Sequence, residues 1–218
     1  MTDTLVVATG NRGKLEELRA LLADLPVRVL GVAEALADPP RVVEDGATFV
    51  DNAVKKAYAV ARATMTLTLA DDSGLEVDVL AGRPGVRSAR FAHDHATDAQ
   101  NNAALLSALG ARPAPAPAQA IWFPARFRCV LALVDPIAGG PPRTVEGVCE
   151  GAVIGAARGS SGFGYDPLFV VAGTGKTMAE LGDAEKNRLS HRARAFAALR
   201  PVLAAVLDER ARQAGRPG

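Results

Sequence analysis

The sequence predicts an α/β fold, because buried strands and amphipathic helices alternate along it. Short apolar and β-branched segments, such as residues 4–9 and 126–134, are typical of buried strands. Apolar residues recur at helical spacing in residues 15–22 and 49–61. With 218 residues, of which 49% are hydrophobic, the chain is long enough to bury a sizeable core in a single domain spanning residues 1–218.

The charge and the cysteines exclude several classes of protein. A formal net charge of +1 gives no general attraction for nucleic acid or for an anionic membrane. No segment approaches the about 20 apolar residues of a membrane span, and no signal peptide is evident, so we expect a cytoplasmic protein. Cys129 and Cys149 have neither metal-knuckle spacing nor the density of a disulfide scaffold, which indicates reduced thiols.

The first candidate site is a glycine-bearing loop between a predicted strand and a predicted helix. The N-terminus of a helix presents free backbone N–H groups, which bind anions, and a lysine adds a charge suited to phosphate. The spacing is not that of a Walker A loop, and a plain strand-to-helix turn is the alternative. The loop residues are Thr9, Gly10, Asn11, Arg12, Gly13 and Lys14.

The second candidate site is the acidic pair Asp71 and Asp72, followed by Ser73 and Gly74. Adjacent carboxylates repel each other, and a divalent metal such as Mg²⁺ resolves that repulsion. The alternative is turn chemistry alone, since each of these residues favours turns. We expect a turn here between strands at 65–70 and 75–80. Because adjacent strand residues point to opposite faces, only one of the two acids should face the site.

Glu44 and Lys56 are candidates to share that site. Glu44 lies in residues 42–46, which we expect to end a short strand. Thr48 is placed to cap the following helix, on which Lys56 lies one turn beyond Asn52. Lys56 could therefore reach the same site as Glu44, although a solvated lysine is the alternative.

A glycine-rich aromatic segment, residues 159–169, predicts a pocket for a flat ligand. Glycines allow the backbone to approach closely, and an aromatic ring offers a stacking surface for a nucleobase. An aromatic loop packed on its own core is the alternative. The central residues are Phe163, Gly164, Tyr165 and Asp166.

Hydrogen-bond donors gather near the start of the last predicted helix. Lys186, Ser190, His191 and Arg192 suit carbonyl and phosphate oxygens, although a solvated helix start would also be rich in such residues. Two segments carry no predicted chemistry. Residues 111–118 form a Pro/Ala-rich loop, and residues 208–218 are expected to be a flexible tail.

The order of these motifs, over residues 4–207, resembles the Ham1/RdgB family of inosine triphosphate pyrophosphatases. The resemblance implies an elongated mixed β-sheet flanked by helices, two lobes with a central nucleotide-binding cleft, and a homodimer. It implies Mg²⁺-dependent hydrolysis of a purine nucleoside triphosphate (ITP, dITP or XTP) to the monophosphate and pyrophosphate, which removes non-canonical nucleotides.

The resemblance also assigns roles to residues. Asp72 would accept the proton of the attacking water and bind Mg²⁺ together with Glu44. The triphosphate would contact Thr9, Gly10, Asn11, Arg12, Gly13, Lys14, Lys56 and Ser73. The base would stack on Phe163 in a pocket with Gly164, Tyr165 and Asp166, and it would be read by Lys186, His191 and Arg192.

Two other functions stay open at this point. A Maf-like nucleotide pyrophosphatase would be expected to lack the group of Ser190, His191 and Arg192. A non-catalytic nucleotide-binding protein would need the loop and the aromatic segment but not the carboxylates. The acidic residues Glu44 and Asp72 therefore favour an enzyme.

Overall fold

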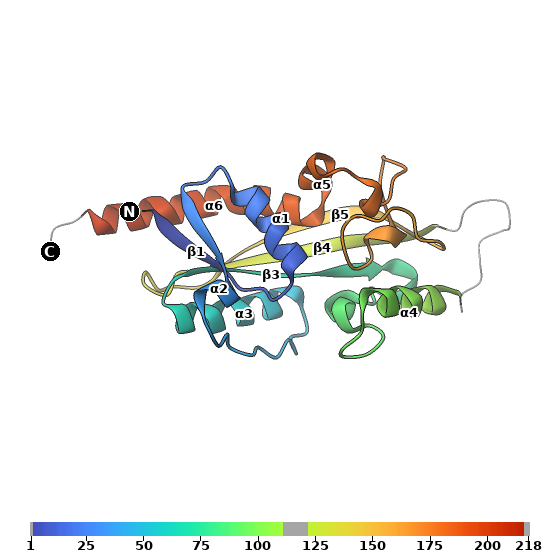
Figure 1. The fold of residues 1–218 in the computed structure, drawn as a ribbon, viewed down its shortest axis with the longest axis horizontal. Helices are drawn as coiled ribbons and strands as arrows, with labels where there is room; N and C mark the ends of the chain where they lie inside the picture. The colour runs from blue at the N-terminus through green and yellow to red at the C-terminus, as the bar shows by residue number, and fades with distance from the viewer. Residues whose placement is uncertain (1, 111–121, 216–218) are drawn as a thin grey trace. The chain divides into compact units, whose positions relative to one another are not determined.

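The structure of the protein is a computed structural model, and it describes residues 2–110 and 122–215. Six strands form one sheet in the order β2-β1-β3-β4-β5-β6 (Figure 1). Strand β1 pairs in parallel with β2 and β3, whereas β5 and β6 are antiparallel, so the sheet is mixed and the predicted α/β class is confirmed. The strands are β1 (Asp3–Val7), β2 (Val27–Gly31), β3 (Leu67–Val77), β4 (Trp122–Val134), β5 (Arg143–Ile154) and β6 (Phe169–Val171).

Helices follow most strands, as the apolar periodicity predicts. The last helix runs through Pro201 and continues to Ala214. Residues 208–214, which the sequence predicts to be part of a flexible tail, are therefore helical. Among the residues in the structure, no helix is both long and apolar enough to cross a membrane. The predicted Pro/Ala-rich loop at 111–118 lies outside the described residues. The helices are α1 (Arg12–Leu22), α2 (Val32–Ala35), α3 (Phe49–Thr64), α4 (Asp98–Gly110), α5 (Asp183–Leu189) and α6 (His191–Ala214).

The chain folds into two compact units, and strands β3, β4 and β5 contribute residues to both. Each unit has its own hydrophobic core, so we describe each by itself. The first unit comprises Met1–Asp72, Cys129–Gly147 and Arg192–Gly218, and the second comprises Ser73–Arg128 and Val148–His191.

In the first unit, α1 and α6 cover one face of the strands and α3 lies on the other face (Figure 1). Leu18 and Leu22 of α1 and Leu199 of α6 are buried against alternate residues of β1, β3 and β4. Burying a leucine side chain of this kind contributes about 1.5–3 kcal/mol. Helix α3 begins at a capping box, in which Thr48 accepts a hydrogen bond from the backbone of Asp51, as its sequence predicts.

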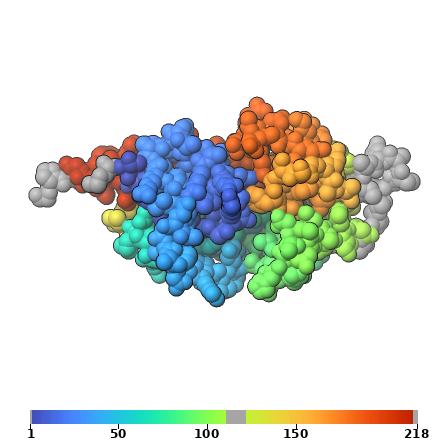
Figure 2. Space-filling view, viewed as in Figure 1, coloured from blue at the N-terminus to red at the C-terminus, as the bar shows by residue number. Residues whose placement is uncertain are grey.

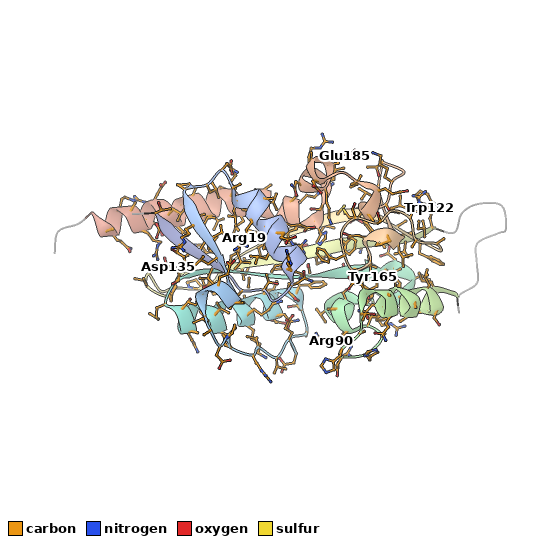
Figure 3. All side chains as sticks on the ribbon, viewed as in Figure 1. Arg19, Arg90, Trp122, Asp135, Tyr165 and Glu185 are labelled. Atoms are coloured by element: carbon orange, nitrogen blue, oxygen red, sulfur yellow. The ribbon has the colours of Figure 1, made fainter. Side chains whose placement is uncertain are left out.

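In the second unit, α4 buries Leu105 and Leu109 in a core that also contains the rings of Phe127 and Phe169. The centroids of these two rings are 4.6 Å apart. The ring of Tyr165 (Figure 3) is buried in the same core, and its hydroxyl donates a 2.8 Å hydrogen bond to the Ser88 carbonyl. The core therefore fixes the helix and the aromatic segment within one unit.

The turn predicted at Asp71 and Asp72 is wrong, because β3 continues without interruption from Leu67 to Val77. Asp and Gly favour turns when their polar groups must find local partners. Here both carboxylates find cationic partners distant in sequence, Lys14 for Asp71 and Lys56 for Asp72. Tertiary ion pairing thus overrides the local preference.

The short strand predicted to end at residues 42–46 is also absent from the structure, and Glu44 lies in an irregular segment. Side chains of α3 hold this segment in place of strand pairing. Asn52 accepts a 2.8 Å hydrogen bond from the Gly46 backbone, and Lys55 pairs with Asp45. A Cβ at Gly46 would lie 2.7 Å from the Asn52 amide oxygen, which explains the glycine.

Candidate active site

The loop after β1 leads directly into the first turn of α1, in the predicted order of strand, loop and helix. Asn11 caps α1 by accepting a 3.0 Å hydrogen bond from the backbone N–H of Lys14, and Thr9 accepts a 3.1 Å bond from Asn11. Gly10 and Arg12 are exposed, and the Arg12 side chain contacts Glu16. The loop therefore precedes an eleven-residue helix, whose N-terminus favours a bound anion.

Asp71 is the centre of a buried ionic network in the first unit. Its carboxylate pairs with the Lys14 ammonium, accepts a 3.0 Å bond from Arg192 Nε and accepts a 3.1 Å bond from the Cys129 thiol. Arg192 also pairs with Glu17. Burial alone raises the pKa of Asp71, but Arg192 and Lys14 together hold that pKa well below its ordinary value. Asp71 is therefore an ionised carboxylate whose oxygens are engaged by neighbouring side chains.

Cys129 and Cys149 are both buried, and neither forms a disulfide within the described part of the chain. Burial, with a further effect of the Asp71 charge, raises the pKa of the Cys129 thiol well above its ordinary value. Cys129 therefore keeps its proton and acts as a donor to Asp71.

Asp72 has different partners from Asp71, as expected for adjacent residues of a strand. The Lys56 ammonium lies 2.9 Å from Asp72 Oδ1 and 2.9 Å from Glu44 Oε2, so it bridges the two carboxylates. The Asn52 amide donates a 3.3 Å hydrogen bond to Asp72 Oδ2. Only 8% of the Asp72 side chain is exposed, against 36% for Glu44. The pair is thus open to solvent on the Glu44 side.

The pKa values of this cluster reflect one ammonium shared by two acids. Burial raises the pKa of Asp72 and outweighs the opposing effect of Lys56. Burial also raises the pKa of Glu44, but Lys56 more than compensates and leaves it below its ordinary value. The pKa of Lys56 is raised, because attraction to Asp72 and Glu44 exceeds the cost of its burial. A further cation would stabilise both acids in their ionised form.

The donor set fits Mg²⁺ held jointly with a phosphate ligand. In residues 2–110 and 122–215 there is no group of three or more His, Cys, Asp or Glu that could hold a metal ion by itself. Mg²⁺ is commonly bound by one or two carboxylates plus substrate phosphates, and it prefers hard oxygen ligands. Glu44 and Asp72 supply two such carboxylates.

The second unit contains a separate cluster around Phe163. Lys186 Nζ lies 2.8 Å from Asp166 Oδ2, and the same oxygen accepts a 3.3 Å bond from the Phe163 backbone. The ammonium also lies 5.3 Å from the centroid of the Phe163 ring. Gly162 has a φ of +82°, and a Cβ there would lie only 2.1 Å from Asp166 Oδ2. The loop shape therefore requires this glycine.

His191 and Tyr165 are core residues of the second unit. The His191 ring stacks on Phe127 with centroids 4.8 Å apart and an interplanar angle of 16°. Burial, with a smaller effect of the Asp98 charge, raises the pKa of the Tyr165 hydroxyl. Tyr165 therefore stays neutral and holds Ser88 through its hydroxyl.

The structure brings together most predicted site residues, but in two groups. Lys14, Glu44, Lys56 and Asp72 belong to the first unit, and Ser73 follows Asp72 directly in β3. Phe163, Gly164, Tyr165, Asp166, Lys186 and His191 belong to the second unit.

Arg192 departs from the predicted grouping with Lys186 and His191. Its side chain is buried in the first unit, on Asp71 and Glu17. The other two side chains pack within the second unit. The role predicted for Arg192 in reading a purine therefore stays a prediction.

Three residues of the first unit, Asn52, Glu17 and Cys129, contribute to the site without having been predicted to do so. Asn52 links Gly46 to Asp72 through two hydrogen bonds. It lies one helical turn before Lys56, and this spacing could have indicated from the sequence that the two side chains share a site. Glu17 pairs with Arg192, and Cys129 donates to Asp71, only in the folded chain. Asp71 and Arg192 are 121 residues apart, so no local pattern indicates their contact.

The protein has an α/β fold in which a capped helix N-terminus follows β1 and a lysine bridges two carboxylates, and these are groups that favour phosphate and a divalent metal. The model of the Ham1 family matches residues 5–202. The chain therefore belongs to the Ham1 family.

Relatives and solved structures agree with this assignment. The chain is 49% identical over 199 residues to a dITP/XTP pyrophosphatase of Geobacter sulfurreducens, and the matched region covers 91% of this chain and 96% of that protein. It is 48% identical over 192 residues to a dITP/XTP pyrophosphatase of Desulforamulus reducens, covering 88% of this chain and 91% of that one.

Among solved structures, a HAM1 protein from Coxiella burnetii matches with a TM-score of 0.80 and 39% identity, covering 93% of this chain and 99% of that one. A nucleoside-triphosphatase, dITP/XTP pyrophosphatase, from Mycobacterium abscessus matches with a TM-score of 0.69 and 40% identity, covering 90% of this chain and 98% of that one.

Proposed function

We propose that this protein is a Mg²⁺-dependent nucleoside triphosphate pyrophosphatase acting on ITP, dITP and XTP. It converts each to the monophosphate and pyrophosphate, and so removes non-canonical purines from the nucleotide pool. The observation that carries this proposal is the pair of carboxylates, Glu44 and Asp72, that share the Lys56 ammonium at 2.9 Å. The names of the relatives support dITP and XTP among these substrates.

The triphosphate is bound by the loop before α1 and by two lysines. Backbone N–H groups at the start of a helix and lysine ammonium groups both favour phosphate oxygens. Lys14 and Lys56 are each largely buried beside a carboxylate, with 16% and 12% of their side chains exposed. Each ammonium is therefore held in place before the substrate arrives, which reduces the entropic cost of binding.

Hydrolysis of the bond between the α- and β-phosphates depends on Asp72. Glu44 and Asp72 would hold Mg²⁺, which when bound neutralises phosphate charge and lowers the pKa of a coordinated water. Asp72, as an ionised carboxylate beside the metal, would accept the proton of the attacking water. The amide of Asn52 orients the carboxylate of Asp72. Pyrophosphate leaves with the electrons of the broken bond.

Base selection is assigned to the second unit, where Phe163 would stack on the purine. Inosine and xanthosine carry a 6-oxo acceptor where adenosine carries an amine donor. Donors from Lys186 and His191 would pair with the oxo group and would be mispaired against adenine.

A product assay tests the reaction. ITP, dITP, XTP, GTP and ATP are each supplied with and without Mg²⁺, and pyrophosphate and orthophosphate are measured. We expect Mg²⁺-dependent release of pyrophosphate from the first three. Release of orthophosphate would contradict the reaction, and a preference for other bases would point to a Maf-like specificity. Binding without turnover would identify a non-catalytic protein.

The homodimer and the cytoplasmic location stay predictions. Sedimentation of the purified chain would test the first, since a monomer at assay concentrations would exclude it. Localisation of the tagged chain in cells would test the second.

A further inference from the structure

We propose that Asp98 and Asn102 of α4 are positioning residues for the nucleobase, because together they clamp the peptide groups of Gly164 beside Phe163. This inference rests on the proposed function, in which the Phe163 ring stacks on the base. Neither residue was among those that the sequence assigned to the site.

The clamp consists of two hydrogen bonds to one residue. The backbone N–H of Gly164 donates to Asp98 Oδ2 at 2.7 Å, and the Asn102 amide donates to the Gly164 carbonyl at 3.0 Å. Asp98 and Asn102 are four residues apart, so both lie on the same side of the helix. In Figures 1 and 2 the green helix α4 lies beside the light-orange segment that contains this glycine.

Gly164 needs such a clamp because of its backbone conformation. Its φ is +60°, in the left-handed region, and a Cβ at this position would meet nothing within 4 Å. Glycine is therefore required here for its conformation and not for lack of space. A glycine also visits the right-handed region readily, which would redirect the adjoining peptide. Bonds to both of its peptide groups select one conformation.

The clamp acts on Phe163 through the chain. On the other side of Phe163, its own N–H donates to Asp166, which also holds Lys186 near the ring. The backbone of Phe163 is thus fixed from both directions, by Asp166 and by α4 through Gly164. A stacking ring on a backbone fixed in this way loses less entropy on binding than one on a mobile loop.

Helix α4 is a rigid support for the clamp. Leu105 and Leu109 are buried in the core of the second unit. Asn101, also buried, accepts a 3.0 Å bond from the Ala92 backbone and donates a 3.1 Å bond to the Ala89 carbonyl. The helix is therefore fixed by contacts that do not involve the clamp.

The side-chain amide of Asn102 has one atom that destabilises the fold and one that binds Gly164. Its Oδ1 atom is buried without a hydrogen-bond partner among the described residues, and an unpaired buried acceptor destabilises the fold. An apolar residue would avoid this cost but could not donate to Gly164. The donor at this position is thus what the structure needs.

The test measures KM and kcat for ITP, together with the inhibition constant of inorganic tripolyphosphate, which has no base. In Asp98→Ala and Asn102→Ala we expect KM for ITP to rise about three- to tenfold each, as the loss of one hydrogen bond allows. We expect the inhibition constant of tripolyphosphate and kcat to stay within about twofold.

Two further variants separate positioning from general stability. Asp98→Asn keeps an oxygen acceptor and should restore a KM near that of the wild type. Gln100 lies in the same turn of α4, and its side chain contacts Thr97 and not Gly164. Gln100→Ala is therefore the matched control, for which we expect an unchanged KM.

The proposal is overturned if Asp98→Ala and Asn102→Ala leave KM for ITP unchanged, or if tripolyphosphate binding weakens as much as ITP binding. It is also overturned if Gln100→Ala raises KM equally. If the wild-type protein does not hydrolyse ITP, the proposed function itself fails. If Phe163→Ala raises KM and the clamp variants do not, only the clamp fails.

Discussion

Asp71 and Asp72 are adjacent in β3, yet their surroundings differ in nearly every physical respect. Asp71 is 1% exposed. Its carboxylate forms ion pairs with Lys14 and Arg192 and accepts a hydrogen bond from the Cys129 thiol. Asp72 shares the ammonium of Lys56 with the carboxylate of Glu44 and accepts one hydrogen bond, from the amide of Asn52. The pKa of Asp71 lies well below its ordinary value, whereas that of Asp72 is raised.

The difference follows from the geometry of the strand. Successive side chains of a strand point to opposite faces, so one backbone presents the two acids to different neighbours. Two cations neutralise the charge of Asp71, whereas a single ammonium is shared between Asp72 and Glu44 and leaves a net negative charge there. A cation is therefore expected to bind at Asp72, and Asp71 serves to hold Lys14 and Arg192. Four substitutions test this contrast, from the largest expected effect to the smallest.

Asp72→Asn should abolish turnover without unfolding the protein. We expect Mg²⁺-dependent pyrophosphate release to fall by about 100- to 10,000-fold, the usual contribution of a general base. Because the raised pKa means that the ionised carboxylate destabilises the native state at neutral pH, the free energy of unfolding should stay equal or increase. Urea unfolding and the product assay check both parts, and retained turnover would remove Asp72 from the chemistry.

Asp71→Asn should act mainly on stability. It leaves the ammonium of Lys14 and the guanidinium of Arg192 buried beside a neutral group, and breaking a buried ion pair costs about 3–5 kcal/mol. Urea unfolding measures the loss. The control is Asp78→Asn, whose side chain is 50% exposed and pairs with Arg126, so that about 0–1 kcal/mol is expected. Equal effects of the two substitutions would refute the contrast.

Glu44→Gln should weaken metal use and leave the fold intact. Glu44 is more exposed than Asp72, and Lys56 retains its pair with Asp72. We expect the Mg²⁺ concentration for half-maximal activity to rise by at least about tenfold, as for other losses at metal sites. A Mg²⁺ titration of pyrophosphate release measures this shift. An unchanged midpoint would show that Glu44 is not a ligand.

Cys129→Ala should have the smallest effect. It removes the thiol donor to Asp71, while Lys14 and Arg192 remain, so we expect a loss of about 1–2 kcal/mol in the free energy of unfolding. Cys129→Ser keeps a donor and is the conservative comparison. If the alanine variant lost as much stability as Asp71→Asn, the thiol and not the cations would dominate the network.

The sequence predicts those parts of the site that depend on local order. Asn11 to Lys14 follow a strand and begin a helix, and Thr48 caps another, because capping and periodicity act within a few residues. The aromatic loop around Phe163 is recognisable for the same reason, from its glycines.

The remaining parts depend on contacts between distant residues. The turn expected at Asp71 does not form, because Lys14 and Arg192 stabilise an extended strand there. Glu44 lies outside any strand, since α3 and not a sheet holds its segment. The clamp on Gly164 joins residues 66 and 62 positions apart. Local propensity contains no information on such partners.

The most direct test of the contrast between the two acids is to measure where the metal binds. Mn²⁺ affinity would be determined by electron paramagnetic resonance, in the presence of a non-hydrolysable α,β-methylene analogue of ITP, with circular dichroism to confirm folding. We predict that Asp72→Asn weakens Mn²⁺ binding by at least about tenfold, and that folded Asp71→Asn stays within about threefold of wild type. Loss of Mn²⁺ binding in Asp71→Asn, with retention in Asp72→Asn, would contradict the account.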